Sequence, residues 1–158
     1  SESLSEMASS TRSAVASLRS LLGSIYPVEV PPEGWVVGID DLVDALGQLG
    51  VNVRIDAQAS QLTPTEELLV LRVAREALRN VAAHAHATEA EVRLTERRGR
   101  LVLTVHDNGS GFEPSSRKDG HIGLRLLHDV IRDAGGELTI ESAAAAGTTL
   151  RVELEMAQ

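Results

Sequence analysis

The spacing of apolar residues changes from helical at the N-terminus to a mixture of helical and alternating segments further on. Apolar residues recur every three or four positions in the first 25 residues, most clearly after Ser13, and predict a helix with one apolar stripe: Leu4, Met7, Ala8, Val15, Leu18, Leu22 and Ile25. Such a helix needs a partner, either the rest of the chain or a second copy. Pro27, Pro31 and Pro32 interrupt the pattern. We therefore divide the chain into an N-terminal segment, 1–26, a linker, 27–33, and a domain, 34–158.

Three further helices are predicted within the domain, over residues 35–49, 63–84 and 122–134. The first stops at Gly50 and the third at Gly135-Gly136, because glycine readily adopts the conformation that ends a helix. The second has the strongest start signal. Thr63 is a good N-cap, Pro64 suits the first helical position, and two glutamates follow in the first turn.

Five segments alternate between polar and apolar residues, as strands do: Val51–Ile55, Glu91–Glu96, Arg100–His106, Glu137–Glu141 and Thr148–Glu155. Arg98-Gly99 predicts a tight turn between the second and third strands. Four of the five strands can pair as hairpin neighbours. We therefore predict an α/β (α+β) two-layer sandwich, in which a mixed, largely antiparallel sheet carries helices on one face behind an N-terminal helix.

Composition narrows the functional classes. The 158 residues carry a net charge of −8, lack cysteine and include only three aromatic residues. The absence of cysteine excludes a disulfide scaffold, a thiolate metal site and a cysteine nucleophile. The acidic balance argues against a nucleic-acid partner, and no apolar run is long enough for a membrane span. We expect a cytoplasmic domain, whose parent protein can still be membrane-anchored.

The second predicted helix carries a candidate metal site. Glu76, Asn80 and His84 follow one another at four-residue steps and share one face. An acid and an amide on one helix face can supply oxygen ligands to hydrated Mg²⁺. On these residues alone the simpler reading is a solvated face, with Glu76 paired to Arg72 and Arg79. The opposite side is predicted to enter the core: Leu71, Ala74, Leu78 and Val81.

A glycine-rich segment follows the third strand directly: Asp107-Asn108-Gly109-Ser110-Gly111-Phe112. Its glycines allow the backbone to approach a ligand, and the Asp107 carboxylate can accept a hydrogen bond from an amino group. An ordinary turn explains the segment about equally well. It is neither a Walker loop nor a dinucleotide fingerprint, and its acidic residues lack the spacing of a calcium loop.

Two more glycine segments are candidates for ligand contacts. Gly120-His121-Ile122-Gly123-Leu124 opens the last helix, where backbone N–H groups can face an anion. The polar stretch 113–119 before it is interpreted as a short lid, or else as a surface loop. Gly147-Thr148-Thr149 opens the last strand, and its hydroxyls are either ligand contacts or strand residues without a special role.

The order and spacing of these four segments resemble the GHKL superfamily of ATP-binding domains. The local sequence Arg75-Glu76-Ala77-Leu78-Arg79-Asn80-Val81 resembles the corresponding motif in the nitrate-sensor class of bacterial sensor histidine kinases. The same holds for Gly120-His121-Ile122-Gly123-Leu124-Arg125-Leu126-Leu127 and for the short lid. The resemblance covers residues 34–156, and Leu18–Pro27 looks like the tail of a second dimerisation helix.

The resemblance implies a role for each matching residue. Asn80 would ligate Mg²⁺ on the ATP phosphates, and Glu76 would hold or polarise a water near the metal. Asp107 would accept a hydrogen bond from the adenine amino group. The remaining positions would contact the nucleotide. Gly109 and Gly111 would let the purine approach, and Thr148 or Thr149 would lie near the adenine. The lid over the triphosphate would be closed by Gly120, Gly123 and Leu124, and the positions of His84 and His121 in the sequence place them at the site.

The resemblance also implies partners. The γ-phosphoryl would pass to a histidine on the dimerisation domain of the same sensor and then to a response regulator, with the full-length sensor a homodimer. We expect the acceptor histidine to lie outside this chain. Ala83 replaces a basic residue that many such kinases carry three positions after the metal-binding Asn; Arg117 or Lys118 could supply that contact instead.

Two alternatives use the same fold. One is an anti-sigma-factor serine kinase, against which the helical segment at residues 1–25 argues, because those kinases begin close to the catalytic domain. The other is a non-catalytic interaction module. The module is opposed by Glu76, Asn80, Asp107, Gly109 and Gly111, whereas Ala83 leaves it open.

Overall fold

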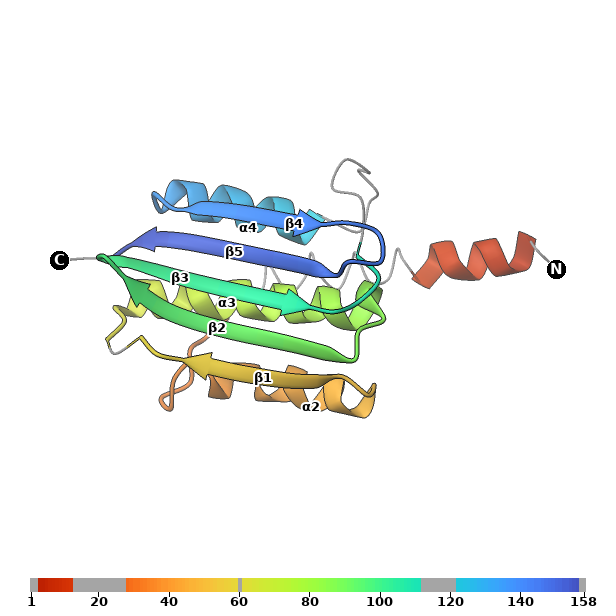
Figure 1. The fold of residues 1–158 in the computed structure, drawn as a ribbon, viewed down its shortest axis with the longest axis horizontal. Helices are drawn as coiled ribbons and strands as arrows, with labels where there is room; N and C mark the ends of the chain where they lie inside the picture. The colour runs from red at the N-terminus through yellow and green to blue at the C-terminus, as the bar shows by residue number, and fades with distance from the viewer. Residues whose placement is uncertain (1–2, 13–27, 60, 112–121, 157–158) are drawn as a thin grey trace.

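The computed structural model describes residues 3–12, 28–59, 61–111 and 122–156. One sheet carries the α-helices of the domain on a single face (Figure 1), as predicted. The elements in chain order are η1 (Val37–Ile39), α2 (Asp40–Gln48), β1 (Asn52–Ala57), α3 (Pro64–Asn80), η2 (Val81–Ala85), β2 (Glu89–Arg97), β3 (Arg100–Asp107), α4 (Ile122–Asp133), β4 (Glu137–Ser142) and β5 (Thr148–Glu155).

The sheet has five strands in the order β1-β2-β3-β5-β4. β1 and β2 are parallel because α3 connects them as a crossover, whereas the other three pairings are antiparallel. The predicted tight turn joins β2 to β3: Arg98 and Gly99 both have positive φ, at 54° and 74°, and Arg97 pairs with Arg100. The prediction of a mixed, largely antiparallel sheet is confirmed.

Helix α3 begins where its capping residues predict. The Thr63 hydroxyl accepts from the Glu66 N–H at 3.2 Å, and the Glu66 carboxylate accepts from the Thr63 N–H at 2.9 Å. This reciprocal pair is a capping box. The sequence predicts this helix to run to about His84. The α-helix α3 ends at Asn80, and the chain continues as the π-helical turn η2.

The helix predicted over residues 35–49 is divided. Trp35 is buried, and its N–H donates to the Glu67 side chain at 3.0 Å, which fixes the chain before the short turn η1. The regular helix α2 starts only at Asp40. Arg75 then links this region to α3, donating to the Gly38 carbonyl at 2.6 Å and to Asp41 at 2.9 Å. The hydrogen bond from Arg75 holds the pKa of the Asp41 carboxyl below its ordinary value.

The core lies between the sheet and the helices. Four predicted core residues of the α3 region are buried there: Leu71, Ala74, Leu78 and Val81. They face apolar residues that alternate along the central strands: Leu101, Leu103, Val105, Leu150, Val152 and Leu154. Among the residues that the structure describes, no helix is long and apolar enough to cross a membrane.

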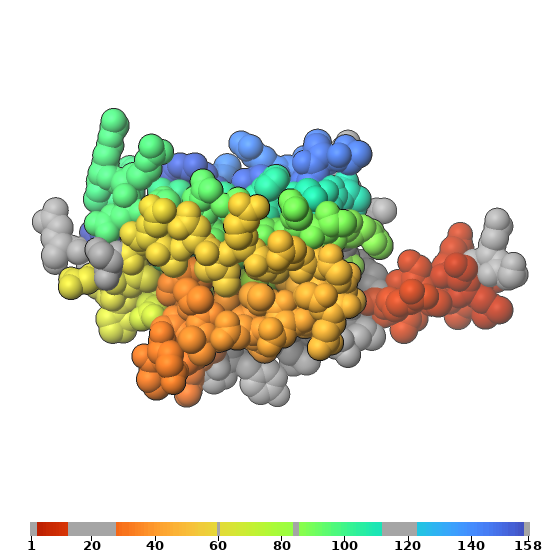
Figure 2. Space-filling model, turned by 60° about the horizontal axis from the view of Figure 1, so that its bottom comes forward, coloured from red at the N-terminus to blue at the C-terminus, as the bar shows by residue number. Residues whose placement is uncertain are grey.

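Residues 3–12 form an exposed helix outside the body of the domain (Figures 1 and 2), with Leu4 71% and Met7 66% exposed. The predicted helix over Ser13–Ile25 lies outside the described residues. In the segment assigned as a linker, Val28 and Val30 are partly buried against the core. This segment therefore contacts the domain that it precedes.

Candidate functional site

The candidate segments meet at one end of the sheet. Asp107 ends β3 and pairs with Thr148, the first residue of β5, and with Ala90 near the start of β2. Figure 1 shows the C-terminal end of α3 and the start of α4 at the same end. Segments that are separated in the sequence thus surround one region between the helices and the sheet.

Asp107 is the buried acid of this region, with 5% of its surface exposed. One carboxylate oxygen accepts from the Gly109 N–H at 2.9 Å, which fixes the start of the glycine segment. Within the described residues the second oxygen has no hydrogen-bond partner. A carboxylate oxygen accepts hydrogen bonds, so this one can receive an incoming donor.

Gly111 and Gly147 allow two loops to touch. Both have positive φ, at 67° and 76°. A Cβ on Gly111 would lie 2.1 Å from the Ala143 carbonyl oxygen, and one on Gly147 would lie 2.2 Å from the Asp107 carbonyl oxygen. Backbone of the β4–β5 turn fills the space into which a side chain at Gly111 would project, and the approach of a purine to this backbone stays a prediction. Gly109 is buried next to Asp107.

The two candidate threonines point to opposite faces of the sheet. Thr148 lies on the helix side with Asp107, and its hydroxyl is 2.8 Å from the Ser142 hydroxyl. Thr149 lies on the open face, with its hydroxyl 2.8 Å from His106 Nδ1. The structure therefore brings Thr148 together with Asp107 and places Thr149 away from it.

Glu76 and Asn80 occupy the last two turns of α3. Glu76 is only 2% exposed, so the reading of Glu76 as part of a solvated helix face is wrong. Its carboxylate is 3.5 Å from Arg79, whereas one turn earlier the buried Nε of Arg72 has no hydrogen-bond partner in the described part of the chain. Asn80 is half-buried where the π-helical turn η2 begins. π-Helical turns occur often at functional sites.

The remaining candidates divide into described and undescribed positions. Gly120, His121 and the predicted lid lie outside the described residues. Gly123 is buried in the first turn of α4, and Leu124 belongs to the hydrophobic core at 7% exposure. The Leu124 side chain packs in the core, and its contact with a nucleotide stays a prediction. The backbone of His84 lies in η2.

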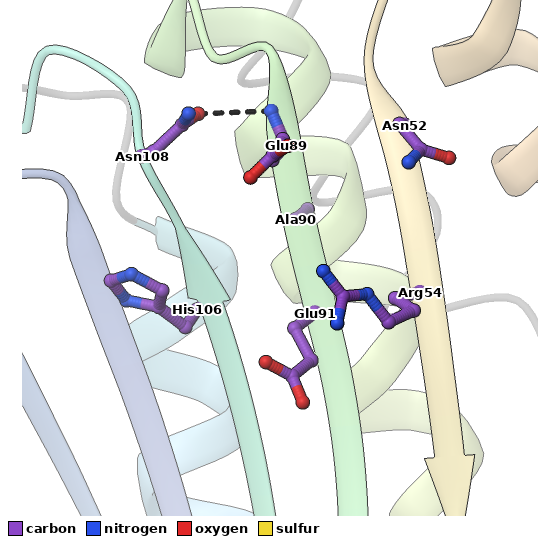
Figure 3. A pocket seen from close by; sticks show the side chains of 7 residues that line it. All are labelled: Asn52, Arg54, Glu89, Ala90, Glu91, His106 and Asn108. Atoms are coloured by element: carbon purple, nitrogen blue, oxygen red, sulfur yellow. Dashed lines mark hydrogen bonds between the residues drawn. The ribbon is translucent and has the colours of Figure 1, made fainter.

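Asn108 is a residue that sequence reasoning missed. Its side-chain oxygen accepts from the N–H groups of Thr88 and Glu89, at 3.0 and 2.9 Å, and its amide donates to the Thr88 hydroxyl at 2.9 Å. Figure 3 shows this side chain reaching from the end of β3 to the first residue of β2. The partners are 19 and 20 residues away in sequence, so no local pattern indicated them.

A separate shallow pocket lies on the open face, with a volume of about 90 Å³. Asn52, Arg54, Glu89, Ala90, Glu91, His106 and Asn108 line it (Figure 3). Asp107 alternates with His106 along β3 and faces the helices. This pocket is therefore distinct from the region around Asp107.

The fold and this arrangement are those of a GHKL-type ATPase domain. Residues 65–158 match the family described as histidine kinase-, DNA gyrase B- and HSP90-like ATPase, and the chain belongs to this family.

Several sensor histidine kinases are similar to this chain in sequence. It is 32% identical over 145 residues to the sensor histidine kinase MctS of Rhizobium johnstonii, covering 87% of this chain and 31% of that protein. It is 28% identical to the sensor histidine kinase LiaS of Bacillus subtilis, covering 87% of this chain and 38% of that one. For the nitrate/nitrite sensor protein NarX of Escherichia coli the identity is 26%, over 96% of this chain and 26% of NarX. The chain thus spans well under half of these relatives.

Solved structures show the same fold. The Acinetobacter baumannii histidine kinase AdeS superposes with a TM-score of 0.65 at 15% identity, covering 99% of this chain and 84% of that one. The histidine kinase domain of the Erythrobacter litoralis EL346 blue-light activated histidine kinase gives 0.64 at 16% identity, covering 91% and 75%.

Proposed function

We propose that this chain binds Mg-ATP as the catalytic domain of a sensor histidine kinase. The γ-phosphoryl of ATP passes to a histidine on the dimerisation domain of the same sensor, and then to a response regulator. Family membership and the names of the relatives support this function over the serine kinase and the non-catalytic module. In this proposal residues 1–26 end a dimerisation helix, 27–33 form the linker, and 34–158 form a cytoplasmic catalytic domain within a homodimer.

In this proposal Asp107 binds the adenine of ATP. One of its oxygens is held by the Gly109 N–H, and the other is open to a donor. The adenine amino group is such a donor. Gly109 and Thr148 lie beside Asp107 at the same strand ends and complete this part of the site.

Asn80 and Glu76 carry the metal end. An amide oxygen and a carboxylate on successive turns of α3 fit a hard divalent cation that keeps part of its water shell. Asn80 would be the direct ligand, and Glu76 would hold a water. Mg²⁺ would supply charge neutralisation at the phosphates.

The protein's contribution to phosphoryl transfer is mainly positioning and charge stabilisation, because the reaction needs little covalent chemistry from side chains. Gly123 is buried in the first turn of α4, where backbone N–H groups can face phosphate. We assign Gly120 to the same phosphate end, and His84 and His121 to the nucleotide site by their positions in the sequence.

Asp107→Asn tests the observation that carries the proposal. The amide oxygen of the variant can still accept from the Gly109 N–H, so the domain stays folded. Its NH₂ group then meets the adenine amino group donor to donor, and we expect the Kd for Mg-ATP to rise about thirtyfold, equivalent to about 2 kcal/mol.

Calorimetric titration measures this change. Asp129→Asn is the matched control, because Asp129 is exposed on α4 and pairs only with Arg132 at 3.2 Å in the described residues. Unchanged ATP affinity in a folded Asp107→Asn variant would refute the adenine assignment.

A further inference from the structure

The side chain of Asn108 continues the sheet beyond its last backbone pair. Ala90 and Asp107 are the final register partners of β2 and β3. One step further, the Asn108 N–H still donates to the Glu89 carbonyl at 3.2 Å, while its side-chain oxygen receives the N–H groups of Thr88 and Glu89. Figure 3 shows the Asn108–Glu89 contact.

Thr88 completes this connection. Its hydroxyl accepts from the Asn108 amide at 2.9 Å, and its carbonyl accepts from the Asn52 N–H of β1 at 2.9 Å. Asn108 is therefore hydrogen-bonded to Thr88, which is itself hydrogen-bonded to β1.

Asn108 lies in the sequence between Asp107 and Gly109, two residues of the proposed adenine site. Asp107 precedes it, and Gly109, whose N–H holds the Asp107 carboxylate, follows it. Asn108 itself is exposed and lines the open-face pocket, so its side chain lies away from the region that Asp107 faces. Its influence on a nucleotide must therefore pass through the position of Asp107.

We propose that Asn108 and Thr88 form a positioning pair that sets base selectivity by fixing the Asp107 carboxylate. This inference rests on the proposed function. The amino group of adenine can donate to a fixed carboxylate, whereas guanine carries an oxygen at the same ring position and is repelled. Selectivity of this kind depends on the carboxylate being held in one place.

The experiment compares Kd values for Mg-ATP and Mg-GTP in the 158-residue chain and its variants. Asn108→Ala removes all three side-chain hydrogen bonds. We expect ATP affinity to fall about tenfold while GTP affinity stays constant, which is about 1.4 kcal/mol of lost discrimination. Thr88→Val removes one hydrogen bond at an exposed position, and its ATP affinity should fall about threefold. Thr88→Ser keeps the hydroxyl, so its ATP affinity should match that of the wild type.

Asn52→Ala is the matched control, because Asn52 lines the same pocket and its side chain makes no hydrogen bond within the described residues. We expect its ATP and GTP affinities to equal those of the wild type. A purely structural role for Asn108 would weaken ATP and GTP binding together or lower only the melting temperature, and either result would overturn the proposal.

Two further results keep the test decisive. If Asn108→Ala does not fold, Thr88→Val carries the comparison, and an unchanged ATP-to-GTP ratio there overturns the pair. If the wild-type chain bound ATP and GTP equally well, the proposed adenine site itself would be wrong. This outcome differs from failure of the positioning pair, in which the wild type prefers ATP but the variants keep the same preference.

Discussion

Gly147 is held in place by the protein's own backbone. Its φ of 76° is one that side chains rarely adopt, and a Cβ there would lie 2.2 Å from the Asp107 carbonyl oxygen. Gly111 meets Ala143 in the same way, and the Ala145 N–H donates to the Ser110 carbonyl at 2.6 Å. The loop after β3 and the β4–β5 turn thus support each other beside Asp107.

Gly147→Ala should therefore cost much more stability than a glycine replacement in open space. Gly99→Ala is the matched control, because Gly99 has a similar φ of 74° but nothing lies within 4 Å of its added Cβ. We expect a loss of about 1 kcal/mol for Gly99→Ala and about 3 kcal/mol for Gly147→Ala in urea unfolding. Equal losses would mean that the two loops do not pack as described.

The sequence predicts roles for single residues where the chemistry is local. Asp107 followed by glycines after a strand indicated a carboxylate that can receive a donor. Burial of Glu76 could not be inferred, because it depends on how α3 packs against the rest of the domain. The faces of Thr148 and Thr149 followed from strand alternation only once the register was known.

At the scale of elements, α3 is the best predicted part of the fold. Its start depends on Thr63, Pro64 and Glu66, which interact within one turn. The division of the helix before it depends on Glu67 holding the Trp35 N–H, 32 residues away in sequence. Local signals therefore placed the start of α3, whereas a tertiary contact fixes the chain before the irregular turn η1.

Thr63→Ala should destabilise the domain without disturbing the proposed site. The variant removes the hydroxyl that caps the Glu66 N–H, and loss of an N-cap costs about 1 kcal/mol. Asn80 lies at the other end of α3, so ATP affinity should stay at the wild-type value. Urea unfolding and nucleotide titration check the two parts, with Thr63→Ser as the control that keeps the cap. Unchanged stability of Thr63→Ala would contradict the role of the capping box.

At the scale of the whole molecule, an acidic domain is proposed to bind a polyanion. The net charge of −8 would oppose ATP if binding depended on cationic side chains. A divalent cation at Asn80 and backbone N–H groups at the start of α4 would resolve this conflict. Family membership supplies the ATPase class, whereas the overall charge gave no indication of it.

Phosphoryl transfer should depend on a segment beyond this chain. We expect γ-labelled ATP to leave no phosphohistidine on the 158-residue chain, and to label a histidine in a polypeptide that adds the dimerisation helix. Acid-labile radioactivity on gels measures both. Labelling of this chain alone would show that it carries its own acceptor and would contradict the proposed division of roles.

The melting temperature with and without Mg-ATP tests the central claim most directly. A ligand that binds only the folded state adds about 2.7 kcal/mol at 100 times its Kd, which corresponds to a rise of about 5–10 °C for a chain of this size. We predict that rise for Mg-ATP and Mg-ADP, and a much smaller one for Asp107→Asn at the same concentration. No shift at millimolar nucleotide would contradict the proposal that this domain binds ATP.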